Sequence, residues 1–287
     1  MPNIAGKCLV STTWLAEHLT APDLIVLDGS WHLPTAARDP HREYLAEHIP
    51  GAVFFDIDEI SDSSNPLPHM LPSTVKFAAR MKAMGVGDGM RVVVYDSVGM
   101  FSAARVWWTF RTMGHEDVAV LDGGLPKWKA EGRAVEDMTP PARPQSHFTP
   151  RLNAELVRDR DDVLSLVKNG GGQILDARAA ARFEGSAPEP RAGLRAGHIP
   201  DSRNLPYTEL LNSDGTLKPA PQLADVLRKA GVDIKRPVVT TCGSGVTASI
   251  LSLALAIVGQ TNSAVYDGSW TEWGADPALP IETGAGR

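Results

Sequence analysis

The sequence predicts an α/β protein of two similar domains, each a parallel sheet flanked by helices. Short runs rich in β-branched residues alternate with helical patterns, for example residues 92–95 before residues 103–111. This alternation is typical of βαβ units. The same signatures return 145 to 150 residues further along the chain. A period of that length indicates a duplicated domain and not a solenoid, whose units run about 20 to 50 residues.

The duplication is visible in three pairs of matching motifs. These are LDGS at 27–30 with LDAR at 175–178, EHIPG at 47–51 with GHIPD at 197–201, and LDGG at 121–124 with YDGS at 266–269. The copies predict domains at residues 8–136 and 153–283. Residues 137–152 contain four prolines and cannot continue a helix or a central strand, so we interpret them as the linker.

Composition narrows the possible partners. The 287 residues, 43% of them hydrophobic, are enough for two cores, and the net charge of −6 without a basic block argues against a nucleic-acid partner. The first twenty residues lack a signal-peptide pattern, and no apolar run approaches the roughly 20 residues that cross a bilayer. We therefore expect no membrane partner and a reducing, cytoplasmic location for the two cysteines.

The segment CGSGVT at 242–247 is the strongest indication of chemistry. Cys242 follows an apolar run at 237–241 and precedes a helical pattern at 248–258. In such a turn, backbone N–H groups and a helix dipole favour the thiolate, and they could also hold an anion or a second sulfur atom carried on the cysteine. Cys242 is therefore the candidate nucleophile. The alternative is a small buried hydrophobe, the usual role of a lone cysteine.

The first copy carries Asp96 where the second carries Cys242. Residues 92–95 match residues 238–241, and Gly99 falls against Gly245. A carboxylate cannot become a persulfide, so the first domain is predicted to be non-catalytic. Cys8 lies outside both motifs and is predicted to be inert.

Taken together, the motifs resemble those of the tandem-rhodanese sulfurtransferases, and within them the 3-mercaptopyruvate sulfurtransferases. The resemblance covers roughly residues 10–282. Its motifs are the two HIP turns, FFDID at 54–58, LPHMLP at 67–72, RVWW at 105–108, RF at 182–183, EPR at 189–191 and CGSGVTA at 242–248.

The resemblance implies two tandem rhodanese-like domains and a two-step sulfur transfer. Cys242 would take sulfur from 3-mercaptopyruvate as a persulfide and release pyruvate. A thiol acceptor, such as a thioredoxin-like protein or a small thiol, or cyanide would then remove the outer sulfur atom.

The resemblance also implies that Arg182 and Arg191 hold the carboxylate and keto oxygens of the substrate. A guanidinium group binds a carboxylate in a bidentate manner, and two of them near one anion would orient the substrate sulfur towards Cys242. Without the resemblance, exposed arginines paired with Glu184 and Glu189 would be the preferred interpretation, because such pairs are common.

A proton relay of Ser244, His69 and Asp58 is implied in the same way, with the last two reaching over from the first domain. Sulfur abstraction requires the thiol proton to be moved and the departing enolate to be protonated. An imidazole oriented by a carboxylate, next to a hydroxyl, can do both. The predicted substrate site is completed by residues of the cysteine loop: Gly243, Gly245, Val246 and Thr247.

The loop also favours one substrate subclass. Gly243 and Ser244 are uncharged, whereas the thiosulfate-using relatives of this family carry basic residues at these positions. A neutral loop suits a carboxylate substrate that is held elsewhere, while a sulfonate-like dianion would require local positive charge. The alternative function is a thiosulfate:cyanide sulfurtransferase (rhodanese).

Two functions from other classes are alternatives. A cysteine phosphatase would require an arginine that closes the loop, and Ala248 with Ser249 supplies none. A non-catalytic scaffolding module is possible for this fold, as Asp96 indicates, but the intact Cys242 argues against it. We expect no metal and no organic cofactor, because the sequence has no CxxC pair or ordered histidine cluster.

Two pairs of polar residues recur in both copies and are predicted to be structural. His48 and His198 would satisfy backbone groups at the turn before a strand. Asp28 and Asp176 would anchor loops through local backbone hydrogen bonds.

Overall fold

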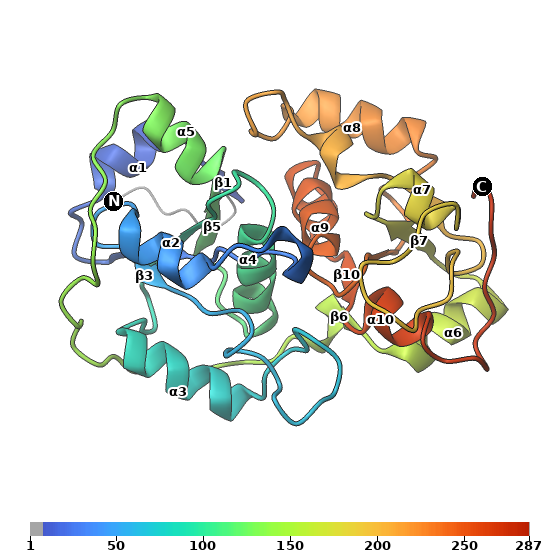
Figure 1. The fold of residues 1–287 in the computed structure, drawn as a ribbon. Helices are drawn as coiled ribbons and strands as arrows, with labels where there is room; N and C mark the ends of the chain where they lie inside the picture. Colours follow the sequence, from blue (N-terminus) through green and yellow to red (C-terminus); the bar gives the residue numbers. More distant parts are fainter. Residues whose placement is uncertain (1–7, 287) are drawn as a thin grey trace. The chain divides into compact units, whose positions relative to one another are not determined.

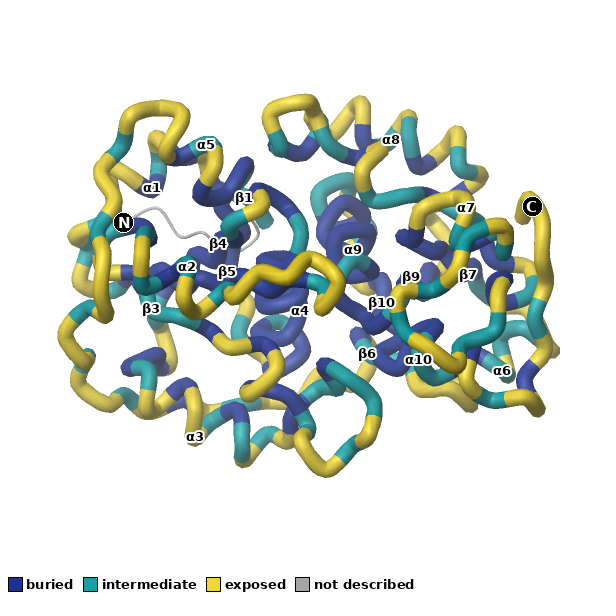
Figure 2. Tube along the Cα trace, viewed as in Figure 1, coloured by how far each residue is buried: buried dark blue, intermediate teal, exposed yellow. Residues whose placement is uncertain are grey.

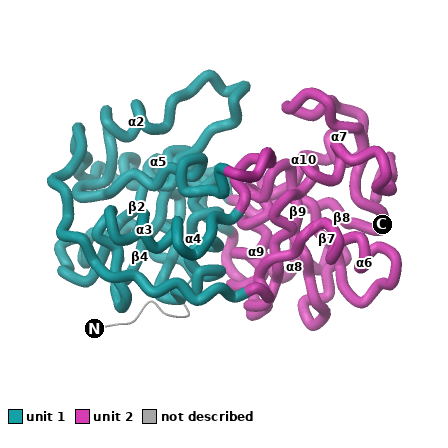
Figure 3. The backbone as a smooth tube through the Cα atoms, turned by 90° about the horizontal axis from the view of Figure 1, so that it is seen from below, with its two compact units in different colours: residues 1–63, 71–153, 212–217 teal, residues 64–70, 154–211, 218–287 magenta. Residues whose placement is uncertain are grey.

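The computed structural model describes residues 8–286, which form two compact units (Figure 3). Of the described residues, unit 1 contains 8–63, 71–153 and 212–217, and unit 2 contains 64–70, 154–211 and 218–286. Each unit has one five-stranded parallel sheet with helices around it. The predicted α/β class with two similar domains is therefore confirmed.

The sheet of unit 1 has the strand order β1-β5-β4-β2-β3, and each neighbouring pair is parallel. The strands are β1 (Leu9–Val10), β2 (Leu24–Asp28), β3 (Val53–Phe54), β4 (Arg91–Tyr95) and β5 (Val118–Leu121). Every residue of β2 and β4 is buried, as expected for parallel strands covered on both faces. Asp28 pairs with Tyr95, so both strands end at the same edge of the sheet.

The helices of unit 1 are α1 (Thr12–His18), α2 (Pro40–Ala46), α3 (Thr74–Met84), α4 (Ala103–Thr112) and α5 (Gly124–Ala130). The first three start at capping residues, Ser11, Asp39 and Ser73, whose side chains accept a backbone N–H from the first turn. Helix α4 packs on β4 and β5 and is buried along almost its whole length (Figures 1 and 2). The residues that follow β4 are thereby fixed between the sheet and α4.

The sheet of unit 2 repeats this topology. Its order is β6-β10-β9-β7-β8, again with parallel neighbours. The strands are β6 (Val157–Arg158), β7 (Gln173–Asp176), β8 (Arg203–Asn204), β9 (Val238–Thr241) and β10 (Ala264–Tyr266). Asp176 pairs with Thr241, just as Asp28 pairs with Tyr95 in unit 1. Cys242 is therefore the first residue after the central strand.

The helices of unit 2 are α6 (Arg160–Asn169), α7 (Ala180–Phe183), α8 (Ala220–Lys229), α9 (Ala248–Ile257) and α10 (Ser269–Trp273). Helix α9 is apolar on all sides and buried from Ala248 to Ala256, whereas α8 buries only Leu223 and Leu227 (Figure 2). Within residues 8–286, none of the helices combines the length and the apolar character needed to cross a membrane.

Residues 139–153 contain no helix or strand, yet they pack on unit 1. Phe148 is buried and meets the rings of Phe77 and Phe110 edge-on, with centroids 5.4 and 6.2 Å away. The Arg151 N–H donates to the Met113 carbonyl at 2.7 Å. Main-chain hydrogen bonds and aromatic contacts thus order this proline-rich segment.

We predict that Gly114→Ala destabilises the protein much more than Gly132→Ala. Both glycines have a positive φ, +82° and +69°, so an alanine costs about 1 to 2 kcal/mol at either position. At Gly114 the new Cβ would also stand 2.5 Å from the Arg151 carbonyl oxygen, whereas at Gly132 nothing lies within 4 Å. Overpacking of this kind adds about 1 to 3 kcal/mol. Denaturant unfolding of both variants measures the difference, and equal losses would contradict the packing of residues 139–153.

Candidate functional site

Cys242 begins a short loop, residues 242–247, that connects β9 to α9; we call it the Cys242 loop. The cysteine is 2% exposed, and Gly245 adopts a φ of +78° that favours glycine. Ser244, in the middle of the loop, is also buried. In a parallel α/β sheet, ligands bind outside the carboxyl ends of the strands, where this loop lies.

The start of α10 fixes the backbone of the Cys242 loop. The Trp270 N–H donates to the Cys242 carbonyl at 3.0 Å, and the Thr271 N–H and hydroxyl both donate to the Gly243 carbonyl, at 2.9 and 2.6 Å. The Cys242 N–H donates to the Ser269 hydroxyl at 3.3 Å. Because these bonds hold two consecutive loop carbonyls on α10, the loop has little freedom to change its conformation.

The matching loop of unit 1, residues 96–101, shows what such a turn can bind. Five backbone N–H groups donate to the Asp96 carboxylate at 2.8 to 2.9 Å. The donors are Val98, Gly99, Phe101, Ser102 and Ala103. In unit 1 this loop is therefore an anion cradle centred on the first residue after the strand. In unit 2 that residue is Cys242.

Arg182 lies against the Cys242 loop. A Cβ built on Gly243 would stand 3.2 Å from Arg182 Nη2, so the guanidinium group occupies the space next to this glycine. Two nitrogens of Arg182, Nη2 and Nε, donate to Glu189 Oε2 at 2.5 and 3.2 Å. The predicted arginine therefore stands one residue from the candidate nucleophile.

The Arg182–Glu189 pair ends a buried chain of alternating charges. Arg178 donates to Glu189 Oε1 at 2.7 Å and to the Asp176 carboxylate at 2.7 to 3.1 Å, and its guanidinium carbon lies 4.4 Å from the centre of the Trp270 ring. The side chains of Arg178, Asp176 and Glu189 are 0%, 1% and 3% exposed. Arg182 thus pairs with Glu189, as the alternative interpretation expected, but the pair is not an exposed one, because the two side chains are 24% and 3% exposed.

From the sequence, Glu189 was expected only as the partner of an exposed arginine, and Arg178 had no predicted role. The available signal was four charged residues within 14 positions, Asp176, Arg178, Arg182 and Glu189, two of them acidic and two basic. Asp176 was predicted to make a local backbone bond, and it does accept the Arg178 N–H at 2.9 Å. Its larger role is to anchor the chain of charges beneath the Cys242 loop.

His69 and Arg191 come together in unit 2, to which residues 64–70 belong. Arg191 Nη2 lies 3.3 Å from His69 Nε2. Because an arginine N–H can only donate, this bond requires a lone pair on Nε2 and therefore a neutral imidazole with its proton on Nδ1. His69 is 5% exposed and has a φ of +63°, which is rare for a residue with a side chain and frequent at functional positions.

Asp58, the third member of the predicted relay, belongs to unit 1. Its carboxylate accepts the indole N–H of Trp31 at 3.1 Å, and its own N–H donates to the Asp56 carboxylate at 3.0 Å. The relay of Ser244, His69 and Asp58 stays a prediction.

The two repeated histidines are structural, as predicted. His48 Nδ1 bonds the Tyr44 carbonyl at 2.8 Å and its ring stacks on Tyr44, with centroids 4.3 Å apart. His198 Nδ1 bonds the Phe183 carbonyl at 2.8 Å and stacks on Phe183 at 3.8 Å. Both histidines therefore satisfy a backbone carbonyl of the preceding helix, α2 in unit 1 and α7 in unit 2. The matching stacks identify α2 and α7 as equivalent helices of the two copies.

The remaining candidate groups add no chemistry to the site. Burial raises the pKa of the Cys8 thiol, with a smaller opposing effect of Arg111, and a protonated thiol is a poor nucleophile. Across residues 8–286, no group of three or more His, Cys, Asp or Glu side chains is placed to hold a metal ion.

Comparison with known proteins agrees with this geometry. The family model described as the rhodanese-like domain matches residues 11–131 and 159–276. The chain belongs to the rhodanese family. Each unit contains one rhodanese domain, and Cys242 is in the second.

Several curated and solved relatives cover most of the chain. It is 44% identical to "Thiosulfate/3-mercaptopyruvate sulfurtransferase 1, mitochondrial" of Arabidopsis thaliana, over 96% of this chain and 78% of that protein. It is 43% identical to "3-mercaptopyruvate sulfurtransferase" of Escherichia coli strain K12, over 95% and 97%. The crystal structure of SseA from Escherichia coli, described as a 3-mercaptopyruvate sulfotransferase, superimposes with a TM-score of 0.84 and 41% identity, over 92% and 98%.

We predict that Asp96→Asn strongly destabilises unit 1. The asparagine NH₂ group would face two or three of the N–H groups that now donate to the Asp96 carboxylate. Each buried donor left without an acceptor costs about 1 to 3 kcal/mol. The measurement is the free energy of unfolding from denaturant titration. Asp225→Asn is the matched control, because this carboxylate is exposed and pairs with Arg228 on the surface, so that its loss should change stability little. A small effect at Asp96 would contradict the anion cradle.

Proposed function

We propose that this protein is a sulfurtransferase that takes sulfur from 3-mercaptopyruvate onto Cys242, releases pyruvate, and passes the sulfur to a thiol or to cyanide. One observation carries the proposal: the Arg182 guanidinium stands beside Gly243, the residue after Cys242. A cation at this distance from a nucleophile can hold the carboxylate of a short substrate while its sulfur reaches the cysteine.

In the first step the Cys242 thiolate attacks the substrate sulfur. The S–S bond forms as the bond between sulfur and C3 of the substrate breaks, and the bonding electrons pass to the enolate of pyruvate. The substrate thiol loses its proton and the enolate gains one, so a persulfide anion and pyruvate result. The loop N–H donors would stabilise the thiolate before the step and the persulfide anion after it, because the negative charge stays almost in place.

Glu189 supports this geometry by fixing Arg182. An arginine side chain alone has many rotamers, and ordering it on binding would weaken substrate affinity. The buried carboxylate of Glu189 holds two nitrogens of Arg182 and is itself held by Arg178. We therefore assign Glu189 and Arg178 as positioning residues, and Arg182 as the carboxylate-binding residue.

The proton transfers are assigned to Ser244 and His69, with Asp58 as the group that orients the imidazole. A neutral His69 can accept a proton, and its bond from Arg191 favours that neutral form. Arg191 would then be near enough to His69 to bind the keto oxygen while the imidazole acts on the sulfur end. The loop residues Gly245, Val246 and Thr247 complete the cradle.

The lack of a side chain at Gly243 supports the preference for 3-mercaptopyruvate over thiosulfate. Any side chain at position 243 would press on Arg182 Nη2, because even its Cβ would stand 3.2 Å away. A basic side chain at position 243 would add positive charge to the loop, but it would also displace the Arg182 guanidinium. Thiosulfate:cyanide sulfur transfer is the alternative, and the name of the Arabidopsis relative includes both substrates.

In the second step an acceptor thiolate attacks the outer sulfur atom, forming the acceptor persulfide and restoring the Cys242 thiolate. A small thiol, a thioredoxin-like protein or cyanide can act in this way, since each is a soft nucleophile. A reducing compartment such as the cytoplasm would keep Cys242 ready for the next cycle.

Our test of the function is intact-mass spectrometry after incubation with 3-mercaptopyruvate and no acceptor. One added sulfur atom is expected, and adding a thiol should remove it. In steady-state assays, kcat/KM for 3-mercaptopyruvate should exceed that for thiosulfate, because the uncharged loop discriminates between the anions in the transition state.

Cysteine variants provide the controls for this test. Cys242→Ser should lose the adduct and turnover, and Cys8→Ser should keep both. Sulfur mapped to Cys8 would refute the mechanism, and equal or better efficiency with thiosulfate would support the alternative function.

We predict that Arg182→Ala and Arg191→Ala each lower kcat/KM for 3-mercaptopyruvate roughly ten- to a hundredfold, the loss of one charge-assisted contact. Glu189→Gln should raise KM more than it lowers kcat, because Arg182 remains but is no longer held. Arg228→Ala, which removes an exposed arginine of α8, is the matched control and should change neither constant. If the Arg182 variant kept full kcat/KM, Arg182 would have no role in substrate binding.

A further inference from the structure

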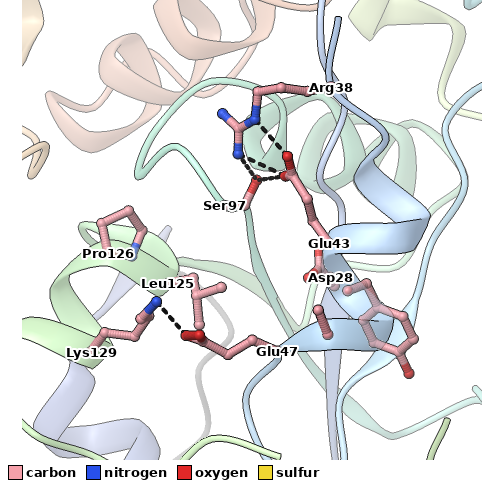
Figure 4. Close-up of a pocket in the computed structure, with 10 residues that line it drawn as sticks. Asp28, Arg38, Glu43, Glu47, Ser97, Leu125, Pro126 and Lys129 are labelled. Atoms are coloured by element: carbon pink, nitrogen blue, oxygen red, sulfur yellow. Dashed lines mark hydrogen bonds and ion pairs between the residues drawn. The ribbon is translucent and has the colours of Figure 1, made fainter. Parts of the chain in front are cut away.

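Unit 1 contains a cavity of about 390 Å³ at the carboxyl ends of its strands (Figure 4). Asp28, the last residue of β2, and Ser97, which follows β4 by two positions, both line it. The remaining walls are side chains of α2, of Glu47 just after it, of α5 and of Arg38. Ligands of parallel α/β sheets bind at this edge. The family assignment and the sulfur-transfer chemistry leave this cavity without a role.

The cavity is the counterpart of the substrate site in unit 2. Tyr44 stacks on His48 as Phe183 stacks on His198, so the residue before each ring, Glu43 in unit 1 and Arg182 in unit 2, occupies the equivalent position.

The contacts of Glu43 agree with this alignment. Glu43 Oε2 lies 3.5 Å from the hydroxyl of Ser97, which follows Asp96 as Gly243 follows Cys242. Arg182 Nη2 approaches Gly243 in the same way. Unit 1 thus has a carboxylate where unit 2 has its substrate-binding cation.

A second charge difference lies beneath the cavity. In unit 2 the buried Asp176 is neutralised by Arg178, but the equivalent position in unit 1 is Ser30. Asp28 is 1% exposed and accepts the Ser30 N–H at 2.9 Å. Burial raises the pKa of Asp28 to about 6, so at neutral pH most molecules still carry this charge.

The other charges of the cavity wall are already paired. Arg38 holds Glu43 through two bonds of 2.7 Å, and Lys129 holds Glu47 at 2.5 Å. In Figure 4, Asp28 lies between these two ion pairs. Among the residues that line the cavity, three carboxylates face two cations. His32 also contacts Glu43 Oε2 at 2.9 Å, and with this histidine counted as neutral the charge in excess is a single negative one.

We propose that this cavity binds a small organic cation, a primary ammonium ion on a short apolar body. The ammonium group would stand near Asp28 and Glu43 and compensate the excess carboxylate, while Leu125 and Pro126 contact the apolar body. The ligand has the opposite charge to the substrate of unit 2, because Glu43 stands in the place of Arg182. The site does not depend on the sulfur-transfer reaction.

The test uses three probes of one size: n-butylammonium, butyrate and 1-butanol. Binding to the full chain is followed by amide chemical shifts in ¹H–¹⁵N NMR spectra. We expect n-butylammonium to shift the amides of α2 and of residues 97–99, with the other two probes at least about tenfold weaker. If 1-butanol bound as tightly as n-butylammonium, the cavity would select for apolar groups and not for charge. If butyrate bound more tightly, the cavity would select anions. Either result overturns the proposal.

Variants locate the site and control for folding. Glu43→Gln and Asp28→Asn should each weaken n-butylammonium binding about tenfold or more. Glu59→Gln, whose carboxylate pairs with Arg80 outside the cavity, should bind like the unaltered protein. Spectra of the variants without ligand report whether unit 1 is folded. If Asp28→Asn does not fold, Glu43→Gln still tests the site, because it keeps the buried Asp28. Unchanged affinity in a folded Glu43→Gln protein, or no binding of n-butylammonium to the unaltered chain, would refute the site.

Discussion

Five backbone N–H groups converge on Asp96 in unit 1, and so many donors in one place are satisfied only by a group that carries negative charge. The convergence follows from the fold, because the chain must turn from a central parallel strand directly into a buried helix. Unit 2 has the same strand order, and its central strand also leads through a short loop into a buried helix, with Cys242 as the first residue of that loop. One constraint on the backbone thus accounts for a structural carboxylate in one copy and for the proposed thiolate and persulfide in the other.

Around this shared backbone, the two copies have diverged in charge. Unit 2 contains the alternating chain Asp176, Arg178, Glu189 and Arg182, and three of these side chains are at most 3% exposed. Burying such groups carries a desolvation cost that their mutual attraction barely recovers, so the chain is a weak source of stability. The chain of charges is better explained by its effect on side-chain orientation. Each charged side chain fixes the position of the next, and the last one, Arg182, faces the Cys242 loop. Unit 1 lacks this chain and presents Glu43 instead.

The sequence predicted the features that depend on local pattern. Alternating strands and helices, repeated at a fixed offset, predicted both sheets, and the aligned copies placed Asp96 against Cys242. The burial of Glu189 could not be predicted, because it depends on how residues 184–197 fold back over the end of β7. The equivalence of Glu43 and Arg182 could not be predicted either, because the segments between the matching strands differ in length. The stacked rings in the structure reveal which residues correspond.

The way Glu189 binds Arg182 decides which edge of the guanidinium remains for a substrate. Glu189 uses one oxygen for each arginine, and its Oε2 takes both Nε and Nη2 of Arg182. A bidentate contact with a second carboxylate then has to use the edge formed by Nη1 and Nη2. Nη2 is also the atom that approaches Gly243, so this edge begins at the Cys242 loop. A short keto acid bound there would extend its far end along the loop towards the sulfur of Cys242. Because position 243 has no β-carbon, the proposed carboxylate site on Arg182 can lie next to Cys242, the proposed nucleophile.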